Sequence, residues 1–442
     1  MKNRLLTLVA MMMIVSVFMT ACGGSNNGGQ ATGNGNKEAD TATNKQEDTK
    51  EPVKLVMWGA VPEEAGPKAV VDAWNAANPN IQVEYVRYVN DDAGNLKLDT
   101  ALMTGQDVDL YVNYNMQLLE KRANAGTALD LGTFGDYDIA GKMGEFAGSW
   151  KIKDKFHALP TTANKNFIWL NKNALDEAGL EVPKEWTLEK LREYAKALTK
   201  EGRYGYVAYD WTMFHQMDGV LQGNYVKDGK SQLDNAAVKQ SLQTYHDMMH
   251  VDKSMPALGE QLATKMDVST MFLKGEAAML GAGSWIFRSA SNLKDFPRDF
   301  VVATAPIPSL AGQEANFAVE GGLGDGVSIN AKSKHTKEAW EFLKWYADGG
   351  MLPLVAGGRV PASNIVDKQA AVSEMIKGVE TLYDKPSIEN TLFVERKQFQ
   401  NAIEKKLADA RKEEVEKYFL KDQNADQFVT NLVKRHNELL KP

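Results

Sequence analysis

The sequence predicts an α/β protein with two domains. Strand-like and helix-like segments alternate through most of the chain, which favours a mostly parallel sheet covered by helices. About 390 residues follow the N-terminal segments described below, and this length fits two domains, with three as the alternative. Beyond the N-terminal leader, no apolar run reaches the length of a membrane span. In such a fold, ligands are expected at the carboxyl ends of the strands.

The N-terminus has the features of a signal peptide. Lys2 and Arg4 precede an apolar run over residues 5–19, which is short for a permanent membrane span. The run ends close to Cys22, the only cysteine of the 442 residues. The stretch "MTAC" resembles a bacterial lipobox, with methionine in place of the usual leucine. We therefore expect residues 1–21 to be a signal peptide and Cys22 to carry a lipid that anchors the chain to the outer face of the cytoplasmic membrane. The alternative is a cysteine that merely ends the leader.

Residues 22–52 form the lipidated cysteine and a linker. They contain almost no side chain that could be buried, so this segment is expected to be disordered. A flexible chain of this length spans about 30 Å, enough to let the folded part move at a membrane surface. Lipidation of Cys22 leaves no thiol for a disulfide, which suits a Gram-positive surface protein.

The charge balance excludes some partners. The chain has 51 Lys and Arg against 58 Asp and Glu, and loss of Lys2 and Arg4 with the leader lowers the net charge from −7 to −9. An acidic chain argues against nucleic-acid binding and against an extended footprint on anionic lipids.

The first predicted elements alternate regularly. Helix spacing of Val70, Trp74 and Ala77 predicts a helix between two strands of alternating pattern. In order, we expect a strand at 53–58, that helix, a strand at 81–89, a helix at 93–104, a strand at 108–112 and a helix at 116–125.

The second half continues the alternation. Thr187 is a candidate N-cap for a helix that ends by Gly202. The strands are expected at 166–171, 204–210, 279–283, 300–308 and 326–330. The further helices are expected around 238–249 and at 336–348, and the last fifty residues are expected to be helical, with Phe399, Ile403 and Leu407 in phase.

Several motifs occur in an order typical of one family. They are "VKLVMWG", "NPNIQVEY", "DVDLYV", "RANAGTALDL", "FHALPTTANKNFIWLNKNALDEAGLEVPKEWTLEKLREYAKALTK", "MFLKGEAAMLGAGSW" and "SKHTKEAWEFLKWYADGG". Together they resemble the family 1 extracellular solute-binding proteins, the lipoprotein or periplasmic receptors that deliver oligosaccharides to ABC importers. The resemblance covers residues 53 to about 365.

The resemblance implies a two-lobed periplasmic-binding-protein-like fold of type II. Its sheets would be rich in parallel strands, with helices on both faces and a hinge between the lobes. The chain would cross between the lobes at "LPTT" (159–162), at "TAPIP" (304–308) and near "GVSIN". Lobe one would comprise residues 53–161 and 304–328, and lobe two residues 162–303 and 329–442.

Three tryptophans are candidates for stacking on a sugar. Trp58, Trp211 and Trp285 each lie at or just past the end of a predicted strand. Gly281 and Gly283 would let a ligand approach the backbone closely in front of the Trp285 ring. The resemblance implies that Trp285 stacks on sugar. The alternative is that each ring closes the top of a core.

The polar candidates lie at similar positions. Glu63 and Glu64 follow the first strand, and the resemblance implies that this acidic loop receives sugar hydroxyls; a solvated loop is the alternative. The other candidates are Asn113, Tyr114, Asn115, Asn164, Asp210, Gly321, Gly322, Asp325 and Arg359. The resemblance implies sugar contacts for Asn113, Tyr114 and Asn115. It implies the same for Asp210 and for Asn164, where a relative has glutamate. A glycine turn remains the alternative for residues 321–325, and a surface ion pair for Arg359.

No catalytic, cofactor or metal signature is recognised. The chain has no phosphate-binding loop, no G-x-S-x-G and no ordered triad, and His246 and His250 lack the glutamate of a zinc helix. The resemblance therefore implies a monomeric receptor rather than an enzyme. It would pass an oligosaccharide to ABC permease subunits served by a separate ATPase. The alternatives are a surface glycoside hydrolase, a receptor for a non-sugar solute, and a sensor that reports sugar to a membrane kinase.

Overall fold

A computed structural model describes residues 51–401 and 403–441 of the chain. The predicted signal peptide, Cys22 and nearly all of the predicted linker lie outside these residues. In the described part of the chain, no helix is both long enough and apolar enough to cross a membrane.

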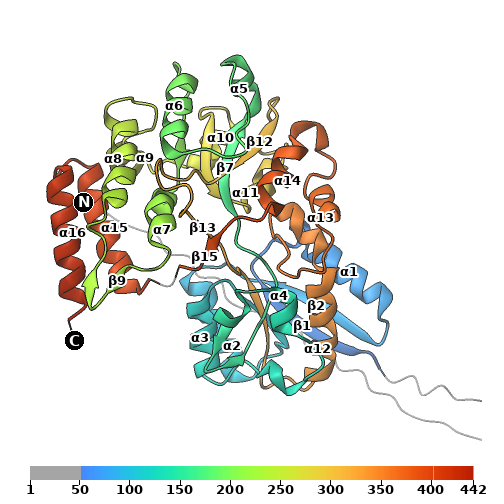
Figure 1. The fold of residues 1–442 in the computed structure, drawn as a ribbon. Helices are drawn as coiled ribbons and strands as arrows, with labels where there is room; N and C mark the ends of the chain where they lie inside the picture. The colour runs from blue at the N-terminus through green and yellow to red at the C-terminus, as the bar shows by residue number, and fades with distance from the viewer. Residues whose placement is uncertain (1–50, 402, 442) are drawn as a thin grey trace, which may run out of the picture. The chain divides into compact units, whose positions relative to one another are not determined.

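The first lobe is built on a five-stranded sheet (Figure 1). In spatial order its strands are β2 (Ile81–Arg87), β1 (Val53–Gly59), β3 (Leu110–Asn113), β14 (Gly326–Ile329) and β6 (Leu159–Pro160). Strand β1 pairs in parallel with β2 and β3, whereas β14 runs antiparallel to β3 and β6.

Side chains alternate along each strand, so both faces of this sheet carry apolar residues, and helices cover both faces. Leu55 and Met57 of β1 pack in a core with α1 (Pro67–Ala77) and α12 (Thr336–Trp345). Trp58, on the opposite face, packs against α2 (Asp92–Thr104). The helices α3 (Met116–Asn124) and α4 (Ile139–Met143) complete this lobe, with a short hairpin of β4 (Lys151–Ile152) and β5 (Lys155–Phe156).

The second lobe is built on a four-stranded sheet. Its spatial order is β12 (Val302–Pro306), β7 (Asn166–Asn171), β11 (Met279–Gly283) and β8 (Val207–Ala208). Strand β7 is antiparallel to both β12 and β11, and only β8 pairs with β11 in parallel. The expectation of parallel-rich sheets is therefore wrong for this lobe, where the sheet is mixed.

Helices also cover both faces of the second sheet. Ile168 and Leu170 of β7 face a core with α6 (Leu188–Leu198) and α8 (Ala236–His250). Phe167 and Trp169 face a second core. The helices of that core are α10 (Val268–Leu273), α11 (Ile286–Ala290), α13 (Lys368–Met375) and α14 (Lys385–Phe393).

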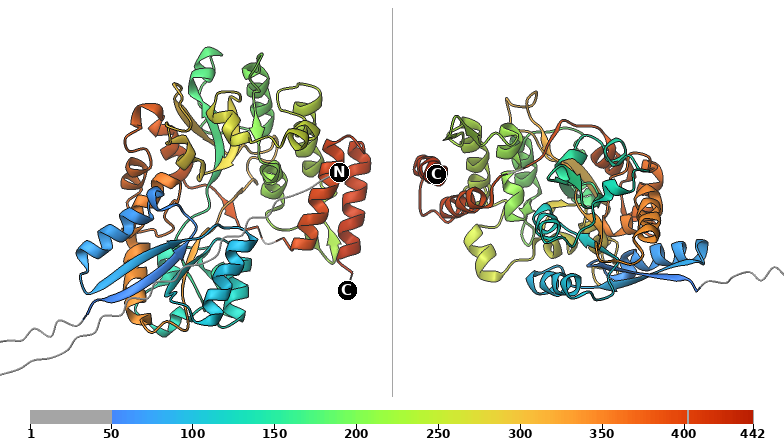
Figure 2. Two further views of the ribbon diagram at one scale, coloured as in Figure 1. Left: turned by 180° about the vertical axis from the view of Figure 1, so that it is seen from behind. Right: turned by 90° about the horizontal axis from the view of Figure 1, so that it is seen from below.

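The remaining elements surround the second lobe. They are α5 (Lys172–Glu177), α7 (His215–Leu221), α9 (Leu258–Thr264), the hairpin β9 (Val226–Lys227) and β10 (Lys230–Ser231), and the parallel pair β13 (Val319–Glu320) and β15 (Gln398–Phe399). Helices α15 (Lys405–Phe419) and α16 (Ala425–Leu439) lie side by side, red in Figures 1 and 2, and contribute Tyr418 and Phe428 to the core that α6 and α8 cover.

The division into lobes differs from the expected one. Residues 304–308 do not cross between lobes, because β12 pairs with β7 and Ala305 packs in the core of the second lobe. Residues 336–354 were assigned to lobe two, but Trp340 and Leu343 of α12 pack with β1 in the first lobe. Figure 1 accordingly shows the orange α12 beside the blue strands. Burial of the apolar face of each element decides its lobe, and local periodicity does not reveal which sheet will bury it.

Three chain segments, here called the linking strands, join the lobes: residues 160–165, 320–326 and 355–362. They are hydrogen-bonded to one another. The Ala163 N–H donates to the Val360 carbonyl (2.9 Å), and the Gly324 N–H donates to the Thr162 carbonyl (2.7 Å). The first linking strand therefore lies between the other two.

Expectations that depend on neighbouring residues agree better with the structure than expectations that depend on long segments. The Thr187 hydroxyl accepts from the Lys190 N–H (3.3 Å) and caps α6, as the sequence predicts. The helical phase expected across residues 399–407 is wrong, because Phe399 belongs to β15 and α15 begins at Lys405.

Loss of the α6 cap gives a direct test of this local interpretation. Thr187→Ala leaves the N-terminal N–H groups of α6 without their side-chain acceptor, so we expect the free energy of unfolding to fall by about 1 kcal/mol. Urea denaturation measures this change. Thr187→Ser keeps the acceptor and serves as the control; equal losses in both variants would contradict the capping role.

Candidate functional site

Three aromatic rings gather at the ends of strands of the second lobe. We call Tyr209, Trp211 and Trp285 the aromatic cluster. Tyr209 follows β8, and Trp285 follows β11. The Tyr209 and Trp211 rings stack with centroids 6.2 Å apart and planes 20° apart, and the Trp285 ring lies 5.7 Å from that of Trp211. Trp211 is 36% exposed and the other two are partly exposed. The Trp285 ring plane is tilted by 46° from that of Trp211, so the cluster presents the partly exposed faces and edges of three aromatic rings to solvent.

The sequence predicted two of these rings and missed the third. Trp211 and Trp285 are brought together although 74 positions separate them in the chain. Tyr209 is the second-last residue of the predicted strand at 204–210, so the same strand-end signal could have identified it.

The glycines before Trp285 have a different role from the expected one. A Cβ atom on Gly283 would overlap the Trp285 ring, and one on Gly281 would overlap the Tyr206 hydroxyl. Protein side chains, rather than an approaching ligand, therefore occupy the space beside both glycines. Gly283 is needed because the Trp285 ring folds back over its backbone.

A backbone contact holds Trp285 in place. The Ser284 hydroxyl donates to the Gly358 carbonyl (2.7 Å), and Gly358 adopts a φ of 81°. A side chain at Gly358 would overlap the Ser284 carbonyl. The turn after β11 is thus packed directly on the third linking strand, which fixes the Trp285 backbone relative to both lobes.

Asp210 joins the aromatic cluster to α15. Its carboxylate accepts from the Trp211 N–H (2.8 Å) and pairs with the Lys412 ammonium (2.6 Å). The hydrogen bond to Asp210 raises the pKa of Lys412. Both side chains are about half exposed, so they can still exchange hydrogen bonds with a ligand.

A polar group lies beneath the cluster. The His215 ring stands edge-on to Trp211, with centroids 5.5 Å apart, and its Nδ1 lies 3.7 Å from a carboxylate oxygen of Glu320. Burial lowers the pKa of His215 to about 4. Burial, together with the charge of Asp218, raises the pKa of Glu320 to about 7. The sequence singled out none of His215, Asp218 and Glu320.

Asp218 and Arg411 form a fully buried ion pair next to this group. Their charged atoms lie 2.6 Å apart, and the Asn401 amide donates to the second oxygen of Asp218 (3.3 Å). Desolvation raises the pKa of Asp218, and Arg411 opposes that rise. The partners are 193 positions apart in sequence, which explains why no local pattern predicted the pair.

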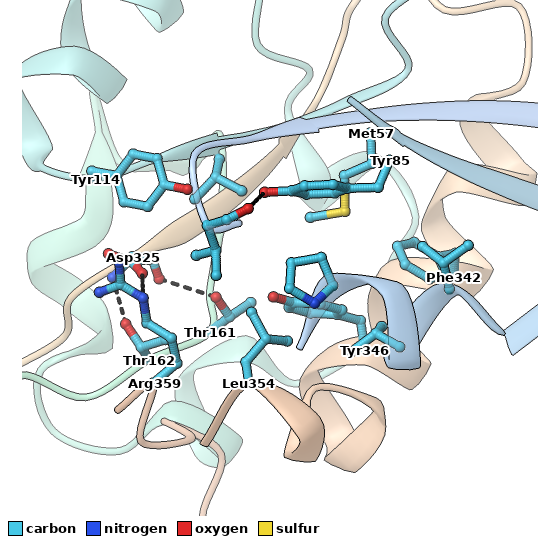
Figure 3. Close-up of a pocket in the computed structure, with 15 residues that line it drawn as sticks. Met57, Tyr85, Tyr114, Thr161, Thr162, Asp325, Phe342, Tyr346, Leu354 and Arg359 are labelled. Atoms are coloured by element: carbon cyan, nitrogen blue, oxygen red, sulfur yellow. Dashed lines mark hydrogen bonds and ion pairs between the residues drawn. The ribbon is translucent and has the colours of Figure 1, made fainter. Parts of the chain in front are cut away.

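Three further predicted residues meet around a small cavity in the first lobe (Figure 3). The Arg359 guanidinium pairs with Asp325 (3.3 Å) and lies 5.7 Å from the centre of the Tyr114 ring. The Tyr114 hydroxyl in turn accepts from the Ala60 N–H (2.6 Å). The cavity has a volume of about 20 Å³, which is room for a water molecule and too little for a sugar ring.

Other predicted residues lie apart from the cluster. Glu63 and Glu64 are exposed and line a hollow of about 740 Å³ opposite Arg288. Asn164 and Gly321 line a cavity of about 30 Å³. Gly322 adopts a φ of 101° on the second linking strand.

Three residues that were predicted to contact a sugar instead interact with other parts of the protein. Trp58 is 7% exposed and belongs to the core beneath α2. Asn113 is fully buried, donates to the Ser328 hydroxyl (2.8 Å) and accepts from Arg122 (2.9 Å). Asn115 caps α3 by accepting from the Leu118 N–H (2.9 Å). The packing and capping interactions of these residues account for their positions.

Replacement of Gly283 tests the packing of Trp285. In Gly283→Ala the new methyl group occupies space now taken by the indole, so we expect the ring to move and the protein to lose about 1–3 kcal/mol of stability. Near-ultraviolet circular dichroism reports the ring and urea denaturation the stability. Gly148→Ala, where no atom lies within 4 Å of the new carbon, is the control. An unchanged aromatic spectrum in Gly283→Ala would refute the contact.

The buried ion pair predicts a pH-dependent stability change. Arg411→Met leaves Asp218 without its cation, which costs about 3–5 kcal/mol when the carboxylate is ionised. Protonation removes that cost: the pKa of Asp218 in the folded variant lies above its unfolded value, so stability is lost as pH rises. We therefore expect a smaller loss at pH 5 than at pH 8 by urea denaturation. Asp218→Asn combined with Arg411→Met is expected to abolish this difference; equal losses at both pH values in the single variant would refute the mechanism.

The chain is similar to known proteins over most of its length. Residues 59–348 match the family described as bacterial extracellular solute-binding proteins. The multiple sugar-binding protein of Streptococcus mutans is 26% identical over 299 residues, which cover 63% of this chain and 67% of that protein. The curated relatives that the chain matches are covered over 61% to 67% of their own lengths.

Solved structures share the fold. A sugar transporter from Rhizobium etli in an open conformation has a TM-score of 0.69 at 19% identity, over 87% of this chain and 99% of its own. An ABC substrate-binding protein from Listeria monocytogenes, in complex with cycloalternan, has a TM-score of 0.68 at 18% identity, over 88% of this chain and 99% of its own. These likenesses confirm the two-lobed α/β fold.

Proposed function

Because this chain belongs to the bacterial extracellular solute-binding protein family, we propose that it binds an oligosaccharide outside the cytoplasm and passes it unchanged to an ABC importer. The sugar preference is supported by its similarity to a sugar-binding relative and to proteins solved with sugars.

The aromatic cluster is the observation that carries this proposal. A sugar ring has apolar C–H faces, and the partly exposed rings of Trp211 and Trp285, whose planes are 46° apart, offer flat apolar faces on which it can stack. Soluble proteins seldom leave neighbouring indoles exposed unless a ligand or partner covers them.

Polar groups beside the cluster suit the hydroxyls of the same sugar. Each hydroxyl that loses water on binding needs a new hydrogen-bond partner. Asp210 can accept from such hydroxyls and Lys412 can donate to them. Movement about the three linking strands would bring the first lobe, with Glu63, Glu64 and the Arg359 group, over a bound sugar.

Delivery requires a membrane partner. In this proposal the ligand-bound lobes dock on the permease subunits of an importer, and a separate ATPase supplies the energy. The chain works as a monomer held at the outer face of the cytoplasmic membrane by a lipid on Cys22. Ligand contacts that differ between the open and closed arrangements would select the closed one.

A sugar panel tests the function. We would follow the thermal unfolding of the protein with mono- and oligosaccharides that include maltose and raffinose. A ligand that binds only the folded state, at about 100 times its dissociation constant, adds about 2.7 kcal/mol of stability. Chromatography of the recovered sugar separates receptor from hydrolase. No stabilisation by any sugar, or cleavage of the sugar that binds, would refute the proposal.

Removal of the Trp285 ring tests the site. We expect Trp285→Ala to weaken binding of a sugar identified in the panel by about 1.5–4 kcal/mol, since stacking area is lost. Isothermal titration calorimetry measures the dissociation constant. Trp345→Phe, in α12 of the first lobe, is the control and is expected to bind normally. An unchanged dissociation constant for Trp285→Ala would remove this ring from the site.

A further inference from the structure

Glu320 is an acidic residue at the junction of the lobes that forms no ion pair with a lysine or arginine of the described residues. Burial has the larger effect on the pKa of Glu320 and raises it, whereas a hydrogen bond with the Asn401 side chain lowers it. It ends β13 and begins the second linking strand, directly before Gly321 and Gly322. Its side chain is 32% exposed. Within residues 51–401 and 403–441, the only basic side chain within 4.0 Å of its carboxylate is His215, at 3.7 Å.

His215 does not neutralise Glu320. Burial keeps the imidazole uncharged at neutral pH, and its Nε2 atom is buried without a hydrogen-bond partner in the described part of the chain. An imidazole nitrogen without a partner therefore lies next to a partly exposed carboxyl group, and a buried polar atom without a partner is costly in a folded protein unless a ligand or water satisfies it.

Most of the other charged groups near Glu320 are already engaged with partners, and Lys165 is the exception. Asp218 of α7 and Arg411 of α15 pair with each other, and the Asn401 amide donates to Asp218. On the side of the small cavity that Glu320 also lines, Lys165 and Arg396 are the charged residues. Arg396 is bound by Glu185 (3.1 Å), and no carboxylate within the described ranges lies within 4.0 Å of Lys165. No lysine or arginine of the described residues lies within 4.0 Å of Glu320, so its carboxylate has no direct cationic partner when ionised.

Glu320 adjoins the aromatic cluster through one ring. The His215 imidazole meets Trp211 edge-on at 5.5 Å and Glu320 at 3.7 Å. The buried His215 ring is thus the contact that joins Glu320 to Trp211, and we infer that a sugar extending past the edge of Trp211 reaches the exposed part of the Glu320 carboxylate.

We propose that Glu320 is a ligand-contacting residue of the aromatic site, where its ionised carboxylate accepts a hydrogen bond from a sugar hydroxyl and makes sugar affinity depend on pH near neutrality. This inference depends on the proposed function, because it needs a sugar at the aromatic cluster. A hydrogen bond to an ionised acceptor is about twice as strong as a neutral one, so binding favours the ionised form.

The direction in which pH changes sugar affinity follows from the protonation state of Glu320 in the sugar-free protein. In the free protein, burial raises the pKa of Glu320 to about 7, so the carboxyl is mostly protonated at pH 6 and mostly ionised at pH 8. A sugar that binds the ionised form pulls this equilibrium toward ionisation. Affinity for the sugar therefore rises with pH, by about tenfold between pH 6 and pH 8.

Calorimetric titrations across pH test the inference. The probe is maltose or raffinose, whichever the wild-type protein binds at pH 8, titrated at pH 6, 7 and 8. We expect the dissociation constant of the wild type to fall about tenfold over this range, and that of Glu320→Gln to stay constant within about twofold. Glu341→Gln, an exposed residue of α12, is the matched control and should keep the wild-type slope.

The outcomes separate the two proposals. Absence of binding to every sugar at pH 8 refutes the proposed function itself. Binding with a flat pH profile in the wild type, or with an unchanged slope in Glu320→Gln, overturns the role of Glu320 alone. Thermal unfolding of each variant without sugar provides the stability readout, and a merely structural Glu320 would change stability without changing the pH slope of affinity.

Discussion

Hydrogen bonds among the three linking strands are the constraint on which the rest of the structure depends. The first strand donates from Ala163 to Val360 on one side and receives from Gly324 at Thr162 on the other. Each lobe buries its own apolar faces, so these bonds are what fixes the ends of the two sheets near each other. The sheet strands start directly beyond them, β7 at Asn166 and β14 at Gly326.

The candidate site follows from that constraint. Asn166 pairs with Gly283 across β7 and β11, so the chain must turn at Ser284 where the third linking strand passes. Trp285 therefore emerges at the junction rather than in either core. Glu320, Asp325 and Arg359 are themselves parts of linking strands or their ends. Groups that are distant in sequence become neighbours because the chain crosses the same narrow region three times.

The sequence was informative where the determinants are local. Thr187 caps α6 because a hydroxyl and an N–H three residues on need only a turn between them. The strand ends next to Trp211 and Trp285 could also be predicted, because the strand-like pattern of residues stops just before each tryptophan. Trp58 satisfies the same strand-end rule and yet is buried, because α2 covers its face of the sheet. Periodicity locates a strand end but does not reveal what lies over it.

Properties that depend on distant partners could not be predicted. The apolar stripe of α12 fits either lobe, and only the available sheet face placed it with the first.

The electrostatics of the site have the same origin. Asp218 and Arg411 lie on two different helices and pair with each other, which leaves Glu320 as a partly exposed acid without an arginine partner near the aromatic cluster. Desolvation acts on Glu320 and His215 in opposite ways, since it disfavours whichever form is charged: it holds a proton on the acid and keeps one off the base. The pair of side chains beneath Trp211, His215 and Glu320, is therefore close to neutral at mildly acidic pH. It acquires its negative charge only as Glu320 ionises, at the point where the two lobes join.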